Sequence, residues 1–421
     1  MKSTALALAL LAGPVMGGTA RAAEGPVPTG VPRLDHVFVI MMENHGYKQI
    51  IGNPSAPFIN AEAKSANLAT NYYGVAHPSL TNYLEVVGGS NFGVLDDNPP
   101  DWHNTTCKPN LATGKPNFES VSTPICPIAG TGIDAATPAI DTTNESPPYP
   151  TINIDGTHGY PAAPKTVGKT IADQLTAAYL KWKTYQEDAP WLTGTDRVNY
   201  SDGTYSNLSD FSKTSPSLNL STGAVVQLYA VKHNPFAYFA STQAAVTAGN
   251  LPHTKSFDGP DGVYAEVASG DLAPFIFIAP NQCNDMHGRG AAKALGVNGG
   301  VGPFCTYDPN DNGTQAGLNP ALITLGDRTV QKLVTAIKAA PVWTTGKTAI
   351  VILWDENDYS ISPINNKVVT IIDKNYGRHG VQSATYYTHF SLLKSLEAGF
   401  GLPCLNHACD ATTAVMTDLF N

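Results

Sequence analysis

Two short polar segments, each at the end of an apolar run, carry side chains suited to binding a cation. Both apolar runs predict buried strands of a parallel sheet. The carboxyl ends of parallel strands meet at one edge, where ligands bind, so we expect the two polar segments to lie together. Acidic groups that converge in this way need a cation to neutralise them. The segments are Glu43-Asn44, after residues 37–42, and Asp355-Glu356, after residues 348–354.

A serine at the start of a predicted helix supplies a candidate nucleophile. Ser79 stands just before the helical pattern from Tyr83 to Val87, and the field at a helix N-terminus favours anions. A hydroxyl in that position, next to carboxylates that hold a cation, is how a metal-activated nucleophile is built. Taken alone, Ser79 would be an ordinary helix N-cap. It lacks the G-x-S-x-G elbow, which argues against a lipase-type serine.

The predicted metal site holds one divalent cation. An all-oxygen ligand set favours Ca²⁺, Mg²⁺ or Mn²⁺ rather than Zn²⁺. Neighbouring carboxylates that face opposite sides would leave one of them out of the site, so Glu356 is the weaker candidate. The candidate ligands are Glu43, Asn44, Asp355, Glu356 and the hydroxyl oxygen of Ser79.

The N-terminal segment and the charge restrict where the protein works. Residues 1–23 contain a basic residue, a short Ala/Leu run and a small-residue cleavage pattern, which together predict a secretory signal peptide. No segment is long and apolar enough to predict a membrane span. We therefore expect a secreted or periplasmic protein. The net charge of −9, without a basic block, argues against nucleic acid as a partner, but a bound cation would still admit an anionic substrate.

The six cysteines fall into three pairs of sequence neighbours, which in an exported chain favour local disulfides over metal binding. Residues 91–164 are rich in Pro, Thr, Asn and Gly and predict a long ordered insertion over the active edge. Its nearby aromatic residues either anchor the insertion, which we favour, or line a pocket. The cysteine pairs are Cys107/Cys126, Cys283/Cys305 and Cys404/Cys409, and the aromatic residues are Phe92, Trp102 and Tyr149.

Strands and helices alternate along the remaining chain, which predicts an α/β fold with a mainly parallel sheet and helices on both faces. We expect residues 24–421 to form a single domain. The further predicted helices are 57–69, 170–180, 327–339 and 389–400, and the further predicted strands are 273–279 and one that opens at Trp182.

Four motifs in this order resemble the phosphoesterase family of secreted bacterial acid phosphatases and phospholipases C, which belongs to the alkaline phosphatase superfamily. The resemblance runs from about Arg33 to Pro403 and implies an alkaline-phosphatase-like three-layer sandwich. Residues 182–188, 232–236 and 400–403 also look like segments of this family. The motifs are Met42-Glu43-Asn44-His45-Gly46-Tyr47, His77-Pro78-Ser79-Leu80-Thr81-Asn82-Tyr83, Cys283-Asn284-Asp285-Met286-His287-Gly288 and Trp354-Asp355-Glu356-Asn357-Asp358.

Histidines in these segments are candidates for proton transfer to a leaving group. His287 and His233 would protonate the leaving oxygen and hold phosphoryl oxygens, although each would be an ordinary loop histidine if taken alone. A nearby dianion raises the pKa of an imidazole, which suits an acidic optimum. Asp285 would either orient His287 or cap a turn. Weaker candidates are His77, His379 and His389, and His45 is expected to lie beside the ligands.

The resemblance implies a metal-dependent acid phosphatase, a hydrolase that cleaves phosphate monoesters through a phosphoserine. Phosphorylated small molecules or lipid headgroups, including phosphoinositides, are the expected substrates, and a monomer is the expected state. Two alternatives stay open. A phospholipase C would cut phosphodiesters at the same site, but that branch of the family often has Arg where this chain has His45. A non-catalytic secreted binding protein predicts a broken constellation, whereas every candidate side chain is present here.

Overall fold

The computed structural model describes residues 24–100, 125–141, 151–189, 229–242, 253–288, 320–357 and 365–421, together with the short strands β9 (Leu218–Asn219) and β10 (Val225–Val226). The predicted signal peptide lies outside these residues, as do Trp102, Cys107, Tyr149, Cys305 and Asp358.

An eight-stranded sheet forms the centre of the molecule, in the order β11-β8-β12-β1-β13-β14-β2-β15. Neighbouring strands are parallel except in the two pairs that contain β14. Strands β12 and β13 are buried along their whole length, and β1 is buried from its second residue onward, which is why their sequences are continuous apolar runs. The strands are β1 (His36–Met42), β2 (Asn67–Ala69), β8 (Trp182–Gln186), β11 (Thr254–Lys255), β12 (Phe275–Ala279), β13 (Thr348–Trp354), β14 (Thr370–Lys374) and β15 (Gln382–Ser383).

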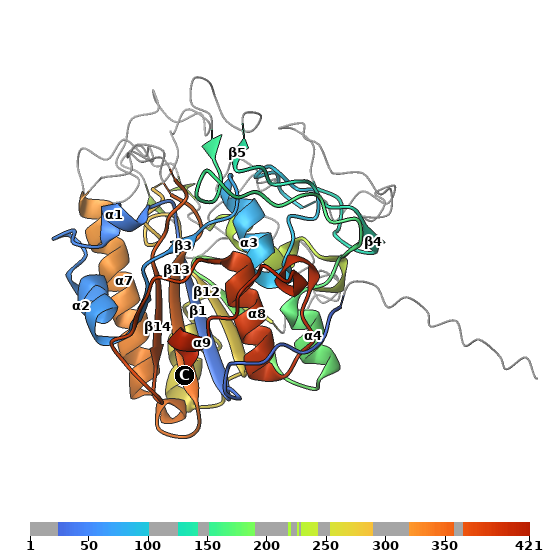
Figure 1. Cartoon of the computed structure of the whole chain (residues 1–421). Helices are drawn as coiled ribbons and strands as arrows, with labels where there is room; N and C mark the ends of the chain where they lie inside the picture. The colour runs from blue at the N-terminus through green and yellow to red at the C-terminus, as the bar shows by residue number, and fades with distance from the viewer. Residues whose placement is uncertain are drawn as a thin grey trace, which may run out of the picture.

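Helices cover both faces of this sheet (Figure 1). On one side α2 (Pro57–Ser65) and α6 (Val263–Ser269) pack against the long helix α7 (Pro320–Ala339). On the other side α3 (Ser79–Gly88) packs against α4 (Ile171–Ala177) and α8 (His389–Phe400). The predicted α/β sandwich with a mainly parallel sheet is therefore confirmed. Among the described residues, no helix has the length and apolarity needed to cross a membrane.

Three predicted helices have the wrong boundaries. The helix predicted over residues 170–180 runs from Ile171 to Ala177. The helix predicted over residues 57–69 ends at Ser65, and β2 follows it, because the Leu68 amide donates to Val381 O and β2 joins the sheet. Helix α7 begins well before Asp327. The Asp327 carboxylate accepts the backbone N–H groups of Phe58 and Ile59, at 3.1 and 2.8 Å, so it caps α2 instead of starting its own helix.

The described parts of the 91–164 insertion lie against α3 and the C-terminal turn. In Figure 1, β4 (Thr131–Gly132) and β5 (Ile140–Asp141) belong to the segment that runs above α3. Asp134 accepts a hydrogen bond from Ser90 Oγ at 2.9 Å and lies 3.0 Å from His407 Nε2. Phe92 is buried and packs edge-on against Phe239, so it anchors this region as the sequence favoured.

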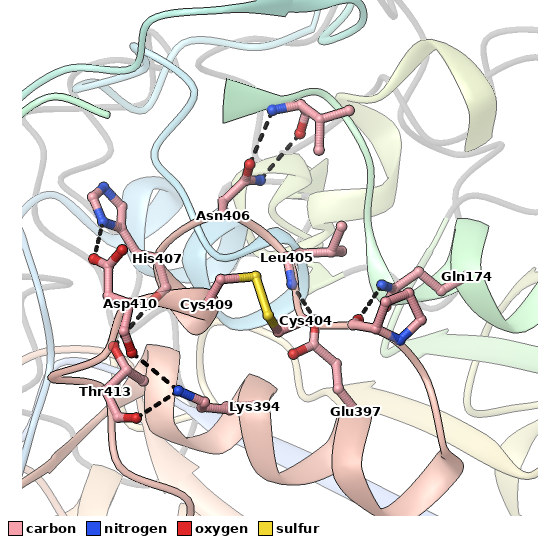
Figure 2. Close-up of a disulfide and its surroundings, with 12 residues drawn as sticks. Gln174, Lys394, Glu397, Cys404, Leu405, Asn406, His407, Cys409, Asp410 and Thr413 are labelled. Carbon is pink, nitrogen blue, oxygen red and sulfur yellow. Dashed lines mark hydrogen bonds and ion pairs between the residues drawn. A yellow bond between two sulfur atoms is a disulfide. The ribbon is translucent and has the colours of Figure 1, made fainter. Parts of the chain in front are cut away.

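A disulfide joins Cys404 to Cys409, as predicted, and closes the turn after α8 (Figure 2). This turn contains the short helix η8 (Asn406–Cys409). Cys126 and Cys283 are also disulfide-bonded. Their predicted partners, Cys107 and Cys305, lie outside the described residues, so these two pairings stay predictions.

Candidate active site

Three acidic side chains converge at the carboxyl edge of the central strands. Glu43 follows β1, Asp285 follows β12 and Asp355 follows β13, and all three are fully buried. They are neighbours because β1 lies between β12 and β13 in the sheet. The Glu43 amide donates to Asp285 O at 2.9 Å, and the Asn44 amide donates to Asp355 Oδ1 at 2.9 Å. The sequence predicts that Glu43 and Asp355 lie at this edge, and the structure shows that Asp285 lies there as well.

Ser79 reaches this acidic group from the first turn of α3. The N-cap of α3 is Pro78, so Ser79 is the first helical residue and the N-cap alternative does not apply. Its Oγ donates to Glu43 Oε2 at 2.9 Å and lies 3.4 Å from Glu356 Oε1. Residues three and four positions further along a helix share its face. Asn82 accordingly donates a hydrogen bond to Glu356, and Tyr83 stacks on the ring of His233.

Glu356 lies on the same side as Ser79, although strand alternation predicted that it would face away from Asp355. Its Oε2 is 3.1 Å from His77 Nδ1 and accepts a hydrogen bond from Asn82 Nδ2 at 3.0 Å. Alternation does not apply because β13 ends at Trp354, and both acids lie in the turn beyond it. The geometric objection to Glu356 as a metal ligand is therefore removed.

His233 is enclosed by the acidic group and an aromatic ring. It ends the short helix η3 (Val231–His233). Its Nε2 lies 3.1 Å from Glu43 Oε1, and its Nδ1 lies 3.3 Å from Asp285 Oδ2. The ring stacks on Tyr83 with centroids 5.2 Å apart and planes at 7°. Asp285 thus faces the ring of His233 with one oxygen, and its other oxygen accepts the backbone N–H of His287, which fits the turn-capping alternative.

Lys232, Asp97 and His287 form the less buried side of the site. Lys232 Nζ lies 2.9 Å from Asp97 Oδ2 and 3.4 Å from His287 Nε2. Asp285 Oδ1 accepts the backbone N–H of His287 at 2.7 Å. Sequence reasoning did not select Lys232, Asp97 or Asn82 as site residues. The available signals were the family-like segment 232–236 and the helical spacing of Asn82 from Ser79.

Burial shifts the protonation equilibria of this site. It raises the pKa of Glu43 and Asp285 well above their usual range, and that of Asp355 as well. The neighbouring carboxylates add to the rise, and Lys232 opposes it. Burial, followed by the charge of Lys232, depresses the pKa of His233 well below its usual value. The sequence predicts a raised pKa for the imidazoles of His233 and His287 when a phosphate dianion is bound. That prediction concerns the occupied site and stays a prediction.

The remaining histidine candidates have different places. His77 contacts Glu356, and His45 Nδ1 lies 3.1 Å from Glu43 O, both beside the acidic group. His389 contacts the backbone of the acidic group, with its Nε2 2.6 Å from Asp355 O. Burial lowers the pKa of His389 to about 4. His379 is exposed beyond the end of β14. Because β14 runs antiparallel to β13, His379 lies at the opposite edge of the sheet.

The donor chemistry of this edge fits a hard divalent cation. Asp355 Oδ2 is buried without a hydrogen-bond partner, and the Glu43 carboxyl group lies beside it. Two buried carboxylates in contact repel each other unless a proton or a cation lies between them. Within the described parts of the chain, no three His, Cys, Asp or Glu side chains form a ready-made ligand set. A cation here would therefore need the neutral oxygens of Asn44 and Ser79, the mixed set that the sequence predicted.

The chain belongs to the Phosphoesterase family, because residues 53–296, more than half of its length, match the model of that family. The matched segment contains Ser79, His233, Asp285 and His287.

Curated relatives carry phosphatase names. The chain is 22% identical over 393 residues to a phosphatidylinositol-3-phosphatase of Mycobacterium tuberculosis, covering 92% of this chain and 84% of the relative. It is 23% identical to an acid phosphatase of Aspergillus fumigatus, covering 87% of this chain and 55% of the relative. The chain thus spans about half the length of that fungal enzyme.

Solved structures give more distant matches. One is a protein of the alkaline phosphatase superfamily from Vibrio parahaemolyticus, with a TM-score of 0.45 and 11% identity, covering 93% of this chain and 73% of that one. Another is the lipoteichoic acid synthase LtaP of Listeria monocytogenes, with a TM-score of 0.42 and 8% identity, covering 95% and 79%.

Proposed function

We propose that this protein is an exported, metal-dependent acid phosphatase that hydrolyses phosphate monoesters through a phosphoserine. The observation that carries the proposal is the hydrogen bond from Ser79 Oγ to Glu43 Oε2, 2.9 Å long, at the start of a helix and among buried carboxylates. Family membership and the phosphatase names of the relatives support it. The mycobacterial relative adds phosphoinositides as candidate substrates.

In the first step, Ser79 Oγ attacks phosphorus in line, the phosphoserine bond forms and the ester bond to the leaving alcohol breaks. Glu43 accepts the serine proton in this proposal, which the hydrogen bond from Ser79 Oγ to Glu43 Oε2 supports. A bound divalent cation would lower the pKa of the serine hydroxyl and offset the charge of the phosphoryl oxygens. Its proposed ligands are Glu43, Asn44, Ser79, Asp355 and Glu356.

The histidines serve the leaving group in this proposal. His287 lies at the less buried side of the site, with Lys232 beside its Nε2, where a leaving oxygen would be. It donates a proton to that oxygen, and His233 takes the more buried position against Glu43. Water then hydrolyses the phosphoserine, and two successive displacements restore the configuration at phosphorus.

The test is hydrolysis of p-nitrophenyl phosphate by wild type and Ser79→Ala across acidic and neutral pH. The variant should lose roughly 10⁴-fold in kcat, because the nucleophile is gone. Ser65→Ala is the control, since this exposed hydroxyl on α2 donates to the backbone carbonyls of Ala61 and Glu62 in its own helix. Chelation should abolish wild-type activity, and Ca²⁺, Mg²⁺ or Mn²⁺ should restore it.

Undiminished hydrolysis by Ser79→Ala would place the nucleophile elsewhere. A wild type that ignores monoesters but cleaves phosphatidylcholine would make the protein a phospholipase C. A wild type that cleaves neither ester and only binds phosphate would support the non-catalytic alternative.

A further inference from the structure

Lys232 places a positive charge beside four carboxyl groups of the candidate site. Its Nζ is 3.4 Å from His287 Nε2, and its charge acts on both Glu43 and Glu356. The side chain is only 12% exposed.

Asp97 fixes this lysine relative to the nucleophile. One carboxylate oxygen of Asp97 pairs with Lys232 Nζ at 2.9 Å, and the other accepts the backbone N–H of Leu80 at 3.1 Å. Leu80 follows Ser79 in the first turn of α3. The ammonium group and the serine hydroxyl are thus tied to the same helix end, so they keep a fixed relation to each other.

The charge of the substrate depends on how many ester bonds it has. A phosphate monoester has one esterified oxygen and carries close to two negative charges near neutral pH, whereas a diester carries one. The four carboxyl groups, Glu43, Asp285, Asp355 and Glu356, would repel the second charge more strongly than the first. One divalent cation offsets only part of this repulsion.

We propose that Lys232 contacts the phosphoryl group and selects monoester dianions over diesters. Its ammonium group supplies the additional positive charge that a dianion requires, and Asp97 holds it in place. This inference rests on the proposed phosphomonoesterase function and adds a determinant of its substrate class. Lys232 is a catalytic residue in this assignment, and Asp97 is a positioning residue.

The experiment compares wild type with Lys232→Met on p-nitrophenyl phosphate and on bis(p-nitrophenyl) phosphate, in the presence of the activating cation. We expect kcat/KM for the monoester to fall about 100-fold or more, and that for the diester about tenfold or less. We also expect the inhibition constant of inorganic phosphate to rise at least about tenfold, since inorganic phosphate carries a similar charge.

Two further variants separate charge from packing. Lys232→Gln can still donate to Asp97 and replaces Lys232→Met if that variant does not accumulate as folded protein. Lys169→Met is the control, because Lys169 is half-exposed and pairs with Glu24 away from the site. It should leave both activities unchanged.

An equal loss on both esters with an unchanged phosphate inhibition constant would overturn the assignment and leave Lys232 a structural residue. In that case wild type would still hydrolyse the monoester, so the proposed function would stand. A wild type that does not hydrolyse the monoester would instead overturn the proposed function, and the inference with it.

Discussion

At the residue scale, the acidic group is costly for the folded protein without a bound cation, because Lys232 offsets only part of its negative charge. Glu43, Asp285 and Asp355 are fully buried, and burial raises the pKa of each. The negative charge of Asp355 raises the pKa of Glu43 and Asp285 further. A protein keeps such an arrangement where activity requires it, at the expense of stability. Removing one negative charge should therefore lower activity and raise stability.

We predict that Asp355→Asn lowers activity on phosphate monoesters at least about 100-fold, because a metal ligand is lost. In the presence of a chelator, the same variant should be more stable than wild type by about 1–2 kcal/mol, since one of the repelling charges is gone. Urea unfolding followed by circular dichroism, with and without cation, measures this. Added cation should stabilise wild type more than the variant. A variant that is less stable than wild type under chelation would contradict the argument.

At the element scale, strand β8 braces the loop that follows β12. Glu187, just beyond β8, accepts the Asn281 backbone N–H at 2.9 Å and the Asn284 side-chain amide at 2.8 Å. Asp188 accepts the Asn281 side-chain amide at 2.8 Å. The braced loop is the one that carries Asp285 and His287. Two neighbouring strands thus determine where those side chains lie.

We predict that Glu187→Gln lowers kcat/KM for phosphate monoesters by about tenfold or more, because one of the two acceptor oxygens becomes an amide donor that faces an N–H group of Asn281 or Asn284. The loss of folding free energy should be about 1–3 kcal/mol. Glu266→Gln is the matched control. Glu266 lies in α6 and accepts a hydrogen bond from the hydroxyl group of Tyr185 in β8, at 2.6 Å. This contact is with β8 and not with the braced loop. The control should lose stability and keep its activity, and similar activity losses in both variants would contradict the prediction.

The elements that could be predicted from the sequence are those with a local pattern. Residues 348–354 and 389–400 have the predicted boundaries, because their apolar residues follow the period of a buried strand and of a helix. Strands β2 and β14 could not be predicted, since each is defined by hydrogen bonds to chain segments far away in the sequence. The place of Lys232 in the site could not be predicted for the same reason, because its contact with His287 joins positions 55 residues apart.

At the scale of the whole molecule, a buried histidine joins three distant segments. His407 lies 3.0 Å from Asp134 in the insertion and 2.7 Å from Asp410 in the C-terminal turn. Figure 2 shows the pair with Asp410 next to the Cys404–Cys409 disulfide. Glu85 of α3 is buried nearby, and the charge of His407 partly offsets the burial that raises its pKa. This ionic cluster connects the nucleophile helix, the insertion and the C-terminal turn.

We predict that this cluster makes stability depend on alkaline pH. The two carboxylates raise the pKa of His407 to about 9, against the opposing effect of burial. A folded-state pKa above the unfolded one gives stability that is complete below about pH 6.5 and is lost as pH rises through about 9. The contribution is about 3 kcal/mol. Urea unfolding of wild type at about pH 6 and pH 9.5 should reveal this loss, and His407→Gln should reduce it. Equal pH dependence in the two proteins would contradict the prediction.

The sheet order also determines when activity can appear. Strands β1 and β13 are neighbours in the sheet but lie far apart in the sequence. The backbone N–H of Asn44, just after β1, donates to Asp355, 311 residues later. While the chain is being synthesised, β1 therefore cannot pair with β13 until a late stage, and no product that ends before β13 contains Asp355. Catalytic turnover accordingly requires that translation has passed β13 and that β13 has paired with β1.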